Sequence, residues 1–311
     1  DFCLSRGLGD VYKRQYLVGG CVRDLLLGRE PKDYDVATDA LPSQVLELFP
    51  GGRHVGAHFG VVILTEEGAE VEVATFRSDH AYRDGRHPDR IEFETDPRQD
   101  VLRRDFTVNA LLLDPETHEV LDFTGGREDL QARSIRAIGD PERRFREDHL
   151  RMLRAVRFAA SLGFDVEPAT MDAIGRLRRL IQHVSAERVR DELARILTEG
   201  AARRGFELLD LSGLLVEILP EVATMKGVAQ PPEFHPEGDV WVHTLLMLEA
   251  MREPSVTLAL GVLLHDVGKP ATFRVEERIR FDGHAELGAR MAAGILGRLR
   301  FSNDEIRRVE A

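Results

Sequence analysis

The order of apolar and polar residues divides the chain into a strand-rich part and a helical part. From residue 16 to about residue 130, short apolar runs are broken by glycines, and several alternate with the period of two typical of a half-buried sheet. Residues 16–18 form the first run, and residues 22–27 predict a brief helix that Gly28 ends. Further strands are predicted at residues 34–36, 60–65, 70–76 and 110–113. The polar segment 80–100 contains Asp84-Gly85 and two prolines, which predicts a mobile loop.

After Asp129 the pattern changes to the period of amphipathic helices. Helices are predicted at residues 146–162, 168–181, 186–198 and 205–211, and a second helical block begins near Asp239. We therefore expect an α+β protein, in which a mixed-sheet head precedes an all-helical remainder.

Both ends of the sequence depart from these patterns. Residues 1–15 (DFCLSRGLGDVYKRQ) have no period and no cap, and they resemble adapter read-through, so we expect an artefact there. Residues 306–311 stop within a helical pattern without a Gly or Pro terminator, which predicts that the sequence is a fragment.

The composition is that of a globular protein, with 43% hydrophobic and 31% charged residues. The two cysteines, Cys3 and Cys21, give no disulfide framework and no paired zinc spacing. No run of about 18 apolar residues predicts a membrane span, and no charged-then-apolar leader is visible. We expect a cytoplasmic protein without a membrane partner.

The net charge of −12 argues at first against a nucleic-acid partner, but the charge is unevenly distributed. Residues 131–205 contain 16 arginines, no lysine and 11 acidic residues, a local excess of five positive charges. Arginine binds phosphate in a bidentate fork, and the field that steers a polyanion is local. The stretch therefore indicates either an RNA-binding surface or helices with a solvated basic face.

Asp33 and Asp35 carry the first candidate chemistry. Residues two apart on a strand point to one face, and two carboxylates there repel each other unless a cation lies between them. Magnesium prefers oxygen ligands, and a pair of such ions can activate an attacking hydroxyl and stabilise a leaving pyrophosphate. Glu72, on the later predicted strand, is a candidate third ligand.

Gly19-Gly20 precedes a predicted helix and lets the backbone approach a triphosphate, while Arg23 can neutralise phosphate charge. Each signal alone is weak, because a Gly-Gly pair before a helix is usually a plain turn. Their order within residues 19–35 favours the functional interpretation.

Four ordered motifs resemble those of a known family. GGCVRDLLLG (residues 19–28) followed by DYD (residues 33–35) is similar to the first motif of class II nucleotidyltransferases, the tRNA CCA-adding enzymes and bacterial poly(A) polymerases. RRDFTVNA (103–110), DFTGGREDL (122–130) and EDHLRMLRAVRF (147–158) follow in the family's order. The resemblance implies a nucleotidyltransferase head at residues 16–138 and a helical, RNA- and base-selecting neck and body at residues 139–229. It also implies roles in nucleotide binding for Gly20, Arg23, Arg104, Asp105, Asn109, Asp148, Arg151, Arg154 and Arg157.

Asp148 and Arg151 suggest how a base could be chosen without a template. They are three residues apart and would be neighbours on one helical face. Asp148 only accepts hydrogen bonds and Arg151 only donates them, a pattern that matches adenine and cytosine but not guanine or uracil. The alternative is an ordinary helical salt bridge.

The last segment contains His243, the pair His265-Asp266 and His284 on predicted helices, together with Lys269. Imidazoles and a carboxylate can hold a transition-metal ion and activate water for phosphoester hydrolysis. The segment, residues 230–311, resembles an HD-type phosphohydrolase domain, which is expected to be truncated because no later acidic ligand is found. The alternative is that these histidines are packing residues, and His235 and the other histidines show no ligand spacing.

The resemblance implies transfer of CMP and AMP from CTP and ATP to the 3′ end of tRNA, with release of pyrophosphate and two Mg²⁺ ions in the head. Segment 54–64 (HVGAHFGVVIL) is more similar to the CCA-adding pattern than to poly(A) polymerases. Poly(A) addition, A-only addition and CC-only addition stay open, as does an HD phosphohydrolase whose head serves as an RNA-binding module.

Overall fold

The computed structural model describes residues 14–55, 60–66, 69–82, 85 and 88–310. It divides into two compact units, Asp1–Asp148 and His149–Ala311. The finer division into four segments stays a prediction. Within the described residues, no helix is both long and apolar enough to cross a membrane.

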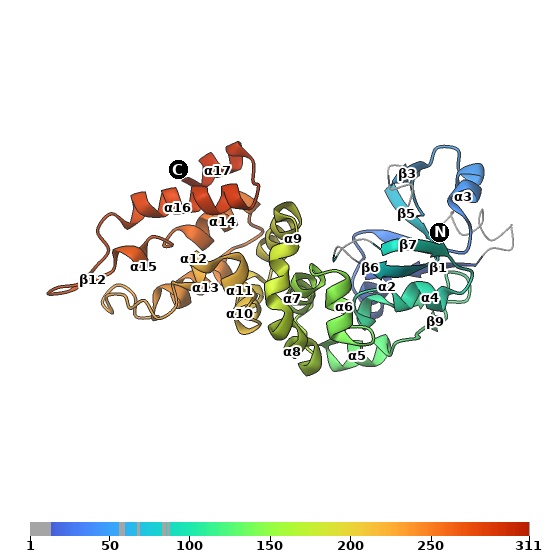
Figure 1. Cartoon of the computed structure of the whole chain (residues 1–311), viewed down its shortest axis with the longest axis horizontal. Coiled ribbons are helices and arrows are strands. Elements are labelled where there is room, and N and C mark those ends of the chain that lie inside the picture. The colour runs from blue at the N-terminus through green and yellow to red at the C-terminus, as the bar shows by residue number, and fades with distance from the viewer. Residues whose placement is uncertain (1–13, 56–59, 67–68, 83–84, 86–87, 311) are drawn as a thin grey trace. The chain divides into compact units, whose positions relative to one another are not determined.

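A mixed sheet forms the centre of the first unit (Figure 1). Within the described residues its order is β3 (Arg53–Val55), β4 (Val61–Glu66), β5 (Ala69–Thr75), β2 (Tyr34–Thr38), β1 (Gln15–Val18), β8 (Leu112–Leu113) and β9 (Val120–Leu121). β2 pairs in parallel with β5 and antiparallel with β1, so the sheet is mixed as expected. Of the artefact expected at residues 1–15, residues 1–13 lie outside the described residues, whereas Gln15 belongs to β1.

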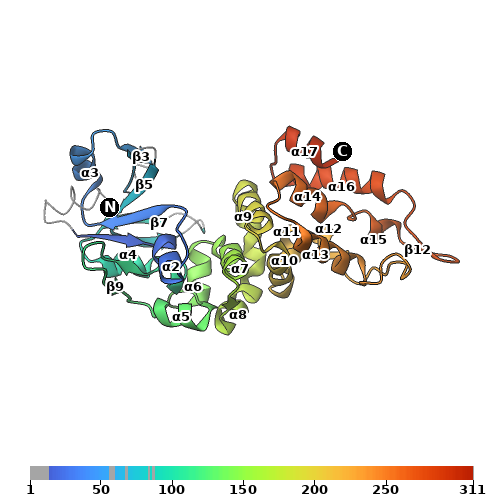
Figure 2. The ribbon, with the colours of Figure 1, turned by 180° about the vertical axis from the view of Figure 1, so that it is seen from behind.

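Short helices and a hairpin complete this unit (Figure 2). They are α2 (Gly20–Leu26), α3 (Pro42–Leu48), the hairpin β6 (Arg77–Tyr82) and β7 (Pro88–Phe93), α4 (Pro97–Leu102), the 3-10 turn η1 (Thr107–Asn109), α5 (Gly126–Ala132), β10 (Ser134–Ile135) and α6 (Pro141–Glu147).

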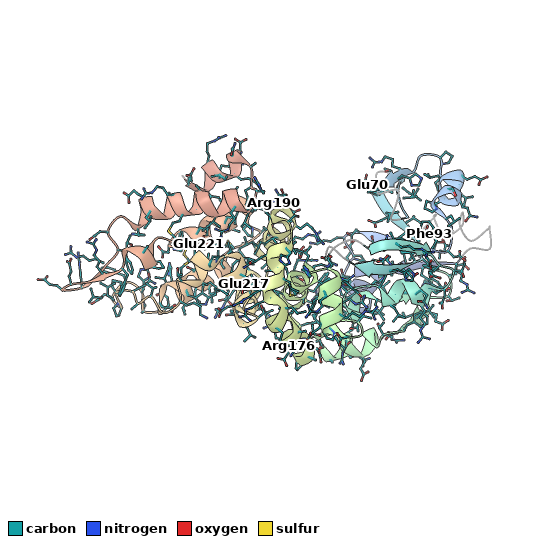
Figure 3. The ribbon with its side chains drawn as sticks, viewed as in Figure 1. Glu70, Phe93, Arg176, Arg190, Glu217 and Glu221 are labelled. Atoms are coloured by element: carbon teal, nitrogen blue, oxygen red, sulfur yellow. The ribbon has the colours of Figure 1, made fainter. Side chains whose placement is uncertain are left out.

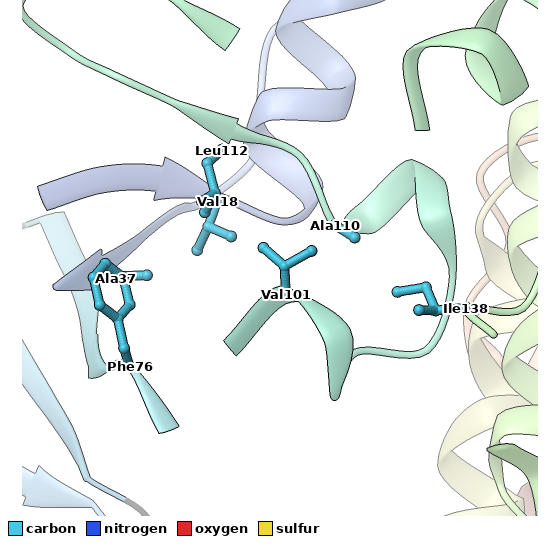
Figure 4. Packing of buried hydrophobic residues seen from close by; sticks show 7 residues of the cluster. All are labelled: Val18, Ala37, Phe76, Val101, Ala110, Leu112 and Ile138. Carbon is cyan, nitrogen blue, oxygen red and sulfur yellow. The ribbon is translucent and has the colours of Figure 1, made fainter. Parts of the chain in front are cut away.

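A small apolar core holds the sheet against the segments that follow it (Figure 4). Alternate residues of β1 and β2 point to one face, where they meet the aromatic ring of Phe76. Tyr16 stacks on Phe76 with ring centroids 6.2 Å apart. The buried members are Val18, Ala37, Phe76, Val101, Ala110, Leu112 and Ile138.

The second unit is almost entirely helical. Its elements are α7 (Arg151–Leu162), β11 (Asp165–Val166), α8 (Pro168–Leu177), the 3-10 helix η2 (Arg178–His183), α9 (Ala186–Thr198), α10 (Ala202–Leu211), α11 (Leu214–Ile218), α12 (Pro220–Ala223), α13 (Val240–Ala250), α14 (Val256–Leu264), α15 (Lys269–Thr272), β12 (Arg274–Val275), β13 (Ile279–Arg280), α16 (His284–Arg298) and α17 (Asn303–Glu310).

Charged residues tie helices of this unit together at the surface (Figure 3). Glu221 of α12 pairs with Arg298 of α16 at 2.6 Å. Arg190 of α9 donates a hydrogen bond to the backbone carbonyl of Arg300, at 2.8 Å. These contacts connect segments far apart in sequence, although exposed ion pairs contribute only about 0–1 kcal/mol each.

The mobile loop expected at residues 80–100 is largely regular structure. β6 and β7 pair antiparallel, with Ser78 opposite Glu92, and α4 begins at Pro97. Asp96 caps α4 by accepting from the N–H of Arg98. The prediction was wrong because this hairpin carries mostly polar side chains, so its apolar alternation is limited to Ile91 and Phe93. Residues 83–84 and 86–87 lie outside the described residues.

The single helix expected at residues 146–162 is two helices. Asp140 accepts from the N–H of Arg143 and Pro141 occupies the first turn, so α6 begins before residue 146. Asp148 has extended backbone angles, φ −147° and ψ 109°, and α7 starts only at Arg151. The premise that Asp148 and Arg151 share one helical face is therefore wrong.

Most other helices agree with the prediction. α9 has the predicted bounds, α13 begins directly after its cap Asp239, and Gly28 follows α2 with φ +68°. The strand predicted at residues 110–113 is shorter, because η1 occupies residues 107–109 and β8 starts at Leu112.

Candidate functional site

Three carboxylates gather where β2 and β5 lie side by side. Asp35 is the register partner of Glu72, so both side chains leave the sheet on the same face. Asp33 is exposed and lies in the bend just before β2, which begins at Tyr34. Burial and the charges of Glu72 and Asp33 raise the pKa of Asp35 to about 6, against the opposing effect of Arg104. A cation bound here would relieve this repulsion.

Gly19 lies directly against this cluster. A Cβ atom at Gly19 would be 3.4 Å from Oδ2 of Asp35 and 3.6 Å from a guanidinium nitrogen of Arg104. Its φ of +80° also disfavours any other residue. The backbone before α2, the carboxylate of β2 and an arginine from beyond α4 therefore meet at one place.

The buried carboxylate of Asp100 holds the two arginines of the RRDF motif. Its Oδ1 accepts from Arg103 at 2.6 Å, and its Oδ2 accepts from Arg104 at 2.9 Å. Burial alone would raise the pKa of Asp100, but Arg104 and Arg103 outweigh it, so this pKa is lowered. Asp100 was not among the residues expected from the sequence, although it lies only three residues before Arg103.

The structure also brings together Arg23 and Asn109, which are far apart in sequence. Arg23 is buried and donates to Oδ1 of Asn109 at 2.7 Å and to Oδ1 of Asp24 at 2.8 Å. Asp105 is buried and accepts from the N–H of Phe106. These contacts hold in place the side chains beside Gly20, where an added Cβ atom would lie 3.6 Å from a guanidinium nitrogen of Arg23.

Arg154 and Arg157 lie on α7 and share Glu192 of α9. Arg157 is only 6% exposed and donates to Oε2 of Glu192 at 2.7 Å, while Arg154 is 3.9 Å from Oε1. The Arg157 guanidinium also lies 4.1 Å from the ring centroid of Phe158. Arg157 is thus engaged inside the second unit, which favours a structural role over the contact with a nucleotide that the resemblance implies.

A cluster of histidines surrounds Asp266 in the second unit. Nε2 of His265 is 3.0 Å from Oδ2 of Asp266, and Nε2 of His284 is 3.9 Å from Oδ1. The His243 and His265 rings are 5.5 Å apart. Lys269 pairs with Asp266 at 2.7 Å. Burial opposes the shift, but His265 and Lys269 hold the pKa of Asp266 at about 2.

The turn that carries His265 and Asp266 depends on Gly268. A Cβ atom there would lie 2.3 Å from the carbonyl oxygen of His284 and 2.8 Å from the N–H nitrogen of Gly288. Only glycine lets this turn approach α16 so closely, and the approach brings His284 to Asp266.

Two overlapping groups have ligand atoms within 4.8 Å of one another: His243, His265 and Asp266 form one, and His235, Glu237 and His243 the other. Within the described residues the carboxylates of the head are not among such groups. The mixed nitrogen and oxygen donors of the second unit fit a transition-metal ion. His235, which shows no ligand spacing in the sequence, is connected to His243 by Glu237, a residue that the sequence analysis did not single out.

Comparisons with known families define the class of protein. Residues 15–136 match the poly A polymerase head domain, residues 163–226 the probable RNA and SrmB-binding site of polymerase A, and residues 239–310 the HD domain. The chain thus matches, in order, models of a poly A polymerase head domain, a polymerase A RNA-binding region and an HD domain. Nucleotidyltransferase and HD families generally use divalent metals.

The chain is similar to proteins named CCA-adding enzymes. It is 45% identical to the CCA-adding enzyme of Geobacillus stearothermophilus over 199 residues, which are 64% of this chain and 49% of that protein. The Bacillus stearothermophilus CCA-adding enzyme in complex with CTP gives a TM-score of 0.73 at 33% identity, covering 97% of this chain and 65% of that one. A tRNA nucleotidyltransferase complexed with a primer tRNA and an incoming ATP analogue gives 0.59 at 25% identity, covering 79% and 74%. The chain spans about half the length of the first curated relatives it matches.

Proposed function

We propose that this protein adds CMP and AMP, taken from CTP and ATP, to the 3′ end of tRNA. The terminal 3′-hydroxyl attacks the α-phosphorus, a new P–O bond forms, the bond to the β-phosphate oxygen breaks, and pyrophosphate and the hydroxyl proton leave. The observation that carries the proposal is the cluster of Asp33, Asp35 and Glu72 beside Gly19 and Arg104. The relatives named above support the choice of tRNA, CTP and ATP.

In this proposal Asp33 and Asp35 hold two Mg²⁺ ions, with Glu72 as a further ligand. Bound magnesium supplies charge neutralisation at the phosphates. The residues of the chain would position the reactants. Gly20 and Arg23 would lie beside the triphosphate, and Arg104 would reach it from the segment that follows α4. Asp105 and Asn109 would hold the neighbouring backbone and the Arg23 side chain in place. Positioning and charge then provide most of the rate acceleration.

Selection of the base is assigned to Asp148 and Arg151 by their donor and acceptor pattern, with Arg154 supporting them. The two residues do not have to share a helical face for this role, because the hydrogen-bonding pattern depends only on the acceptor that Asp148 offers and the donor that Arg151 offers. Cytosine and adenine satisfy that pattern, and uracil and guanine leave polar groups unpaired.

The test is incubation with a tRNA that ends before CCA, with each NTP alone and in mixture. CTP alone should add two residues, CTP with ATP three, and UTP or GTP none. Asp35→Ala should reduce incorporation by at least about 10³-fold, since a metal supplies several kcal/mol of charge stabilisation. A product of A residues only, CC only or long poly(A) would select one of the alternative specificities instead.

A second activity is favoured by the histidine cluster around Asp266. We infer that His243, His265, Asp266 and His284 hold a transition-metal ion and that the HD domain hydrolyses phosphoesters. Hydrolysis of a 2′,3′-cyclic phosphate should be lost in His265→Ala while nucleotide incorporation persists. Hydrolysis without any incorporation by the wild-type protein would instead indicate a phosphohydrolase whose head binds RNA. We also propose that the protein is located in the cytoplasm, as its cysteine usage indicates.

A further inference from the structure

The three histidines around Asp266 share one hydrogen-bonding feature. Nδ1 of His265 lies 2.8 Å from the carbonyl oxygen of Val262, and Nδ1 of His284 lies 2.7 Å from that of Phe281. Nδ1 of His243 lies 2.6 Å from Oε1 of Glu237. Carbonyl and carboxylate oxygens only accept, so each Nδ1 carries a hydrogen and Nε2 is the nitrogen left to bind an ion. Without an ion, Nε2 of His265 also faces an acceptor, Oδ2 of Asp266 at 3.0 Å, so a bound ion would replace the hydrogen there.

The position of the hydrogen on the His243 ring decides in which of the two overlapping groups His243 can be a metal ligand. A neutral imidazole has one lone pair, so His243 can serve only one of the groups as a ligand. With Nδ1–H donated to Glu237, the lone pair of His243 belongs to the group that contains His265 and Asp266. His235 also places its Nδ1 3.0 Å from Oε1 of Glu237, with its ring 4.8 Å from that of His243.

We propose that Glu237 is a positioning residue of the HD cation site: it accepts the Nδ1–H of His243 and thereby directs Nε2 of His243 to the ion. His235, Glu237 and His243 then form a hydrogen-bonded triad and not a second cation site. The inference rests on the proposed metal site of the HD domain. Its physical basis is that a carboxylate behind a ligating imidazole fixes the ring orientation and raises its basicity.

Of the three acceptors that face Nδ1 of these histidines, only that of Glu237 belongs to a side chain, so a substitution can remove it. The acceptors behind His265 and His284 are backbone carbonyls, which a substitution leaves in place. Glu237 lies in the partly exposed segment before α13, so its replacement should leave the helical core intact. Loss of such an outer partner typically weakens metal affinity by about 10–100-fold.

The experiment titrates Ni²⁺ into the protein by calorimetry, in an Asp33→Ala/Asp35→Ala background that removes the head site. Glu237→Ala should weaken binding by about 10–100-fold at an unchanged stoichiometry of one. Glu237→Gln keeps a neutral acceptor and should retain most of the affinity. His235→Ala should bind as the parent does, and His265→Ala should not bind. Equal losses in His235→Ala, Glu237→Ala and Glu237→Gln, or two ions per chain, would overturn the proposal.

A second measurement does not need the metal. Nitrogen-15 NMR of the metal-free protein should show His243 as the Nδ1–H tautomer, and Glu237→Ala should shift it toward a mixture. An Nε2–H tautomer in the parent would refute the role of Glu237. If the parent binds no Ni²⁺ but the tautomer depends on Glu237, the proposed metal site fails while the positioning of His243 stands.

Discussion

Asp35 and Glu72 are register partners across the parallel pair of β2 and β5, and the charge of Glu72 is one of the causes that raise the pKa of Asp35 to about 6. The sheet thus brings together two acidic groups that are far apart in sequence, with Arg104 opposing the shift. Without a bound cation this arrangement costs stability when both groups are ionised.

The first prediction concerns pH and stability in metal-free buffer. Because the folded pKa of about 6 exceeds the ordinary value of 3.8, the folded state binds more protons in this window. The contribution of Asp35 to stability is therefore fully present below pH 3.8 and is lost as the pH rises through 6. Asp35→Asn should melt at a higher temperature than the parent near neutral pH and at a similar temperature in acid.

Thermal melts with a chelator across this pH range provide the measurement. Glu47→Gln, a change of an acidic residue on α3, is the control and should follow the parent at every pH. A parent and an Asp35→Asn variant with parallel profiles would show that this carboxyl titrates normally.

The second prediction concerns Asp100, whose buried carboxylate holds Arg103 and Arg104. Asp100→Asn removes the charge that Arg103 and Arg104 share, while Asp79 stays 3.9 Å from Arg103, so the change should cost up to about 3–5 kcal/mol of stability. The Arg104 side chain would lose its fixed position beside Asp35, so the KM for CTP should rise more than kcat falls. Urea unfolding and steady-state kinetics measure the two effects. Arg104→Lys, which keeps the charge but not the fork, should raise the KM with a smaller loss of stability; normal KM values in both variants would contradict this role.

The sequence predicted the features whose signals are local. The strand that carries Asp35 and the later strand that carries Glu72 were predicted from their alternation, and the bounds of α9 followed from its amphipathic period. Asp33 was expected on the same strand face as Asp35, but it lies in the bend before β2. The β6–β7 hairpin was missed because β6 is largely polar and the apolar alternation of β7 is limited to Ile91 and Phe93. The break at Asp148 was missed because residues 146–149 contain no Gly or Pro that would mark the end of α6. Asp100 lies three and four residues before Arg103 and Arg104, a spacing that indicates helical ion pairs, but the segment was interpreted as a loop. Glu237 could not be predicted, since nothing in its spacing shows that it faces a histidine.

The third prediction concerns the ion pair between Arg157 and Glu192. Both side chains are 7% exposed, and their distance is 2.7 Å. Arg157→Met or Glu192→Gln alone should each cost up to about 3–5 kcal/mol, because each removes the nearest counter-charge of a buried group. Glu192 would keep only Arg154 at 3.9 Å, and Arg157 only Glu199 at 3.5 Å. The double variant should cost less than the sum of the two. Urea unfolding of the four proteins measures the coupling, and strictly additive losses would show that the pair is not coupled.

The fourth prediction concerns base selection by Asp148. Asp148→Ala removes the acceptor for the amino group of cytosine or adenine, so preference for CTP over UTP should fall by about 10²-fold. The ratio of kcat/KM for the two nucleotides measures this preference. Glu142→Ala, which removes a carboxylate from α6, is the matched control and should leave the ratio unchanged. An unchanged ratio in Asp148→Ala would restrict this residue to a structural contact.

The fifth prediction concerns the arginines of residues 131–205 and RNA. Many of them are paired in the structure, but the pairs differ in exposure. The side chains of Arg179 and Arg195 are 83% and 57% exposed, and their carboxylate partners are 4.0 Å and 3.9 Å away. Such pairs are worth only about 0–1 kcal/mol, so a phosphate can replace the carboxylate at little cost. Arg157, by contrast, is held inside the second unit.

We therefore expect tRNA affinity to fall steeply with salt, by orders of magnitude between about 50 and 200 mM if several phosphates are contacted. Arg179→Ala and Arg195→Ala should each reduce the slope of log affinity against log salt by about one, without changing nucleotide preference. Arg307→Ala, an exposed arginine of α17 outside the stretch, should leave the slope unchanged. Filter binding of tRNA at a series of salt concentrations gives the slopes. A slope that all three variants share with the parent would place the RNA on another surface, because a side chain that neutralises a phosphate must release a counterion when it binds.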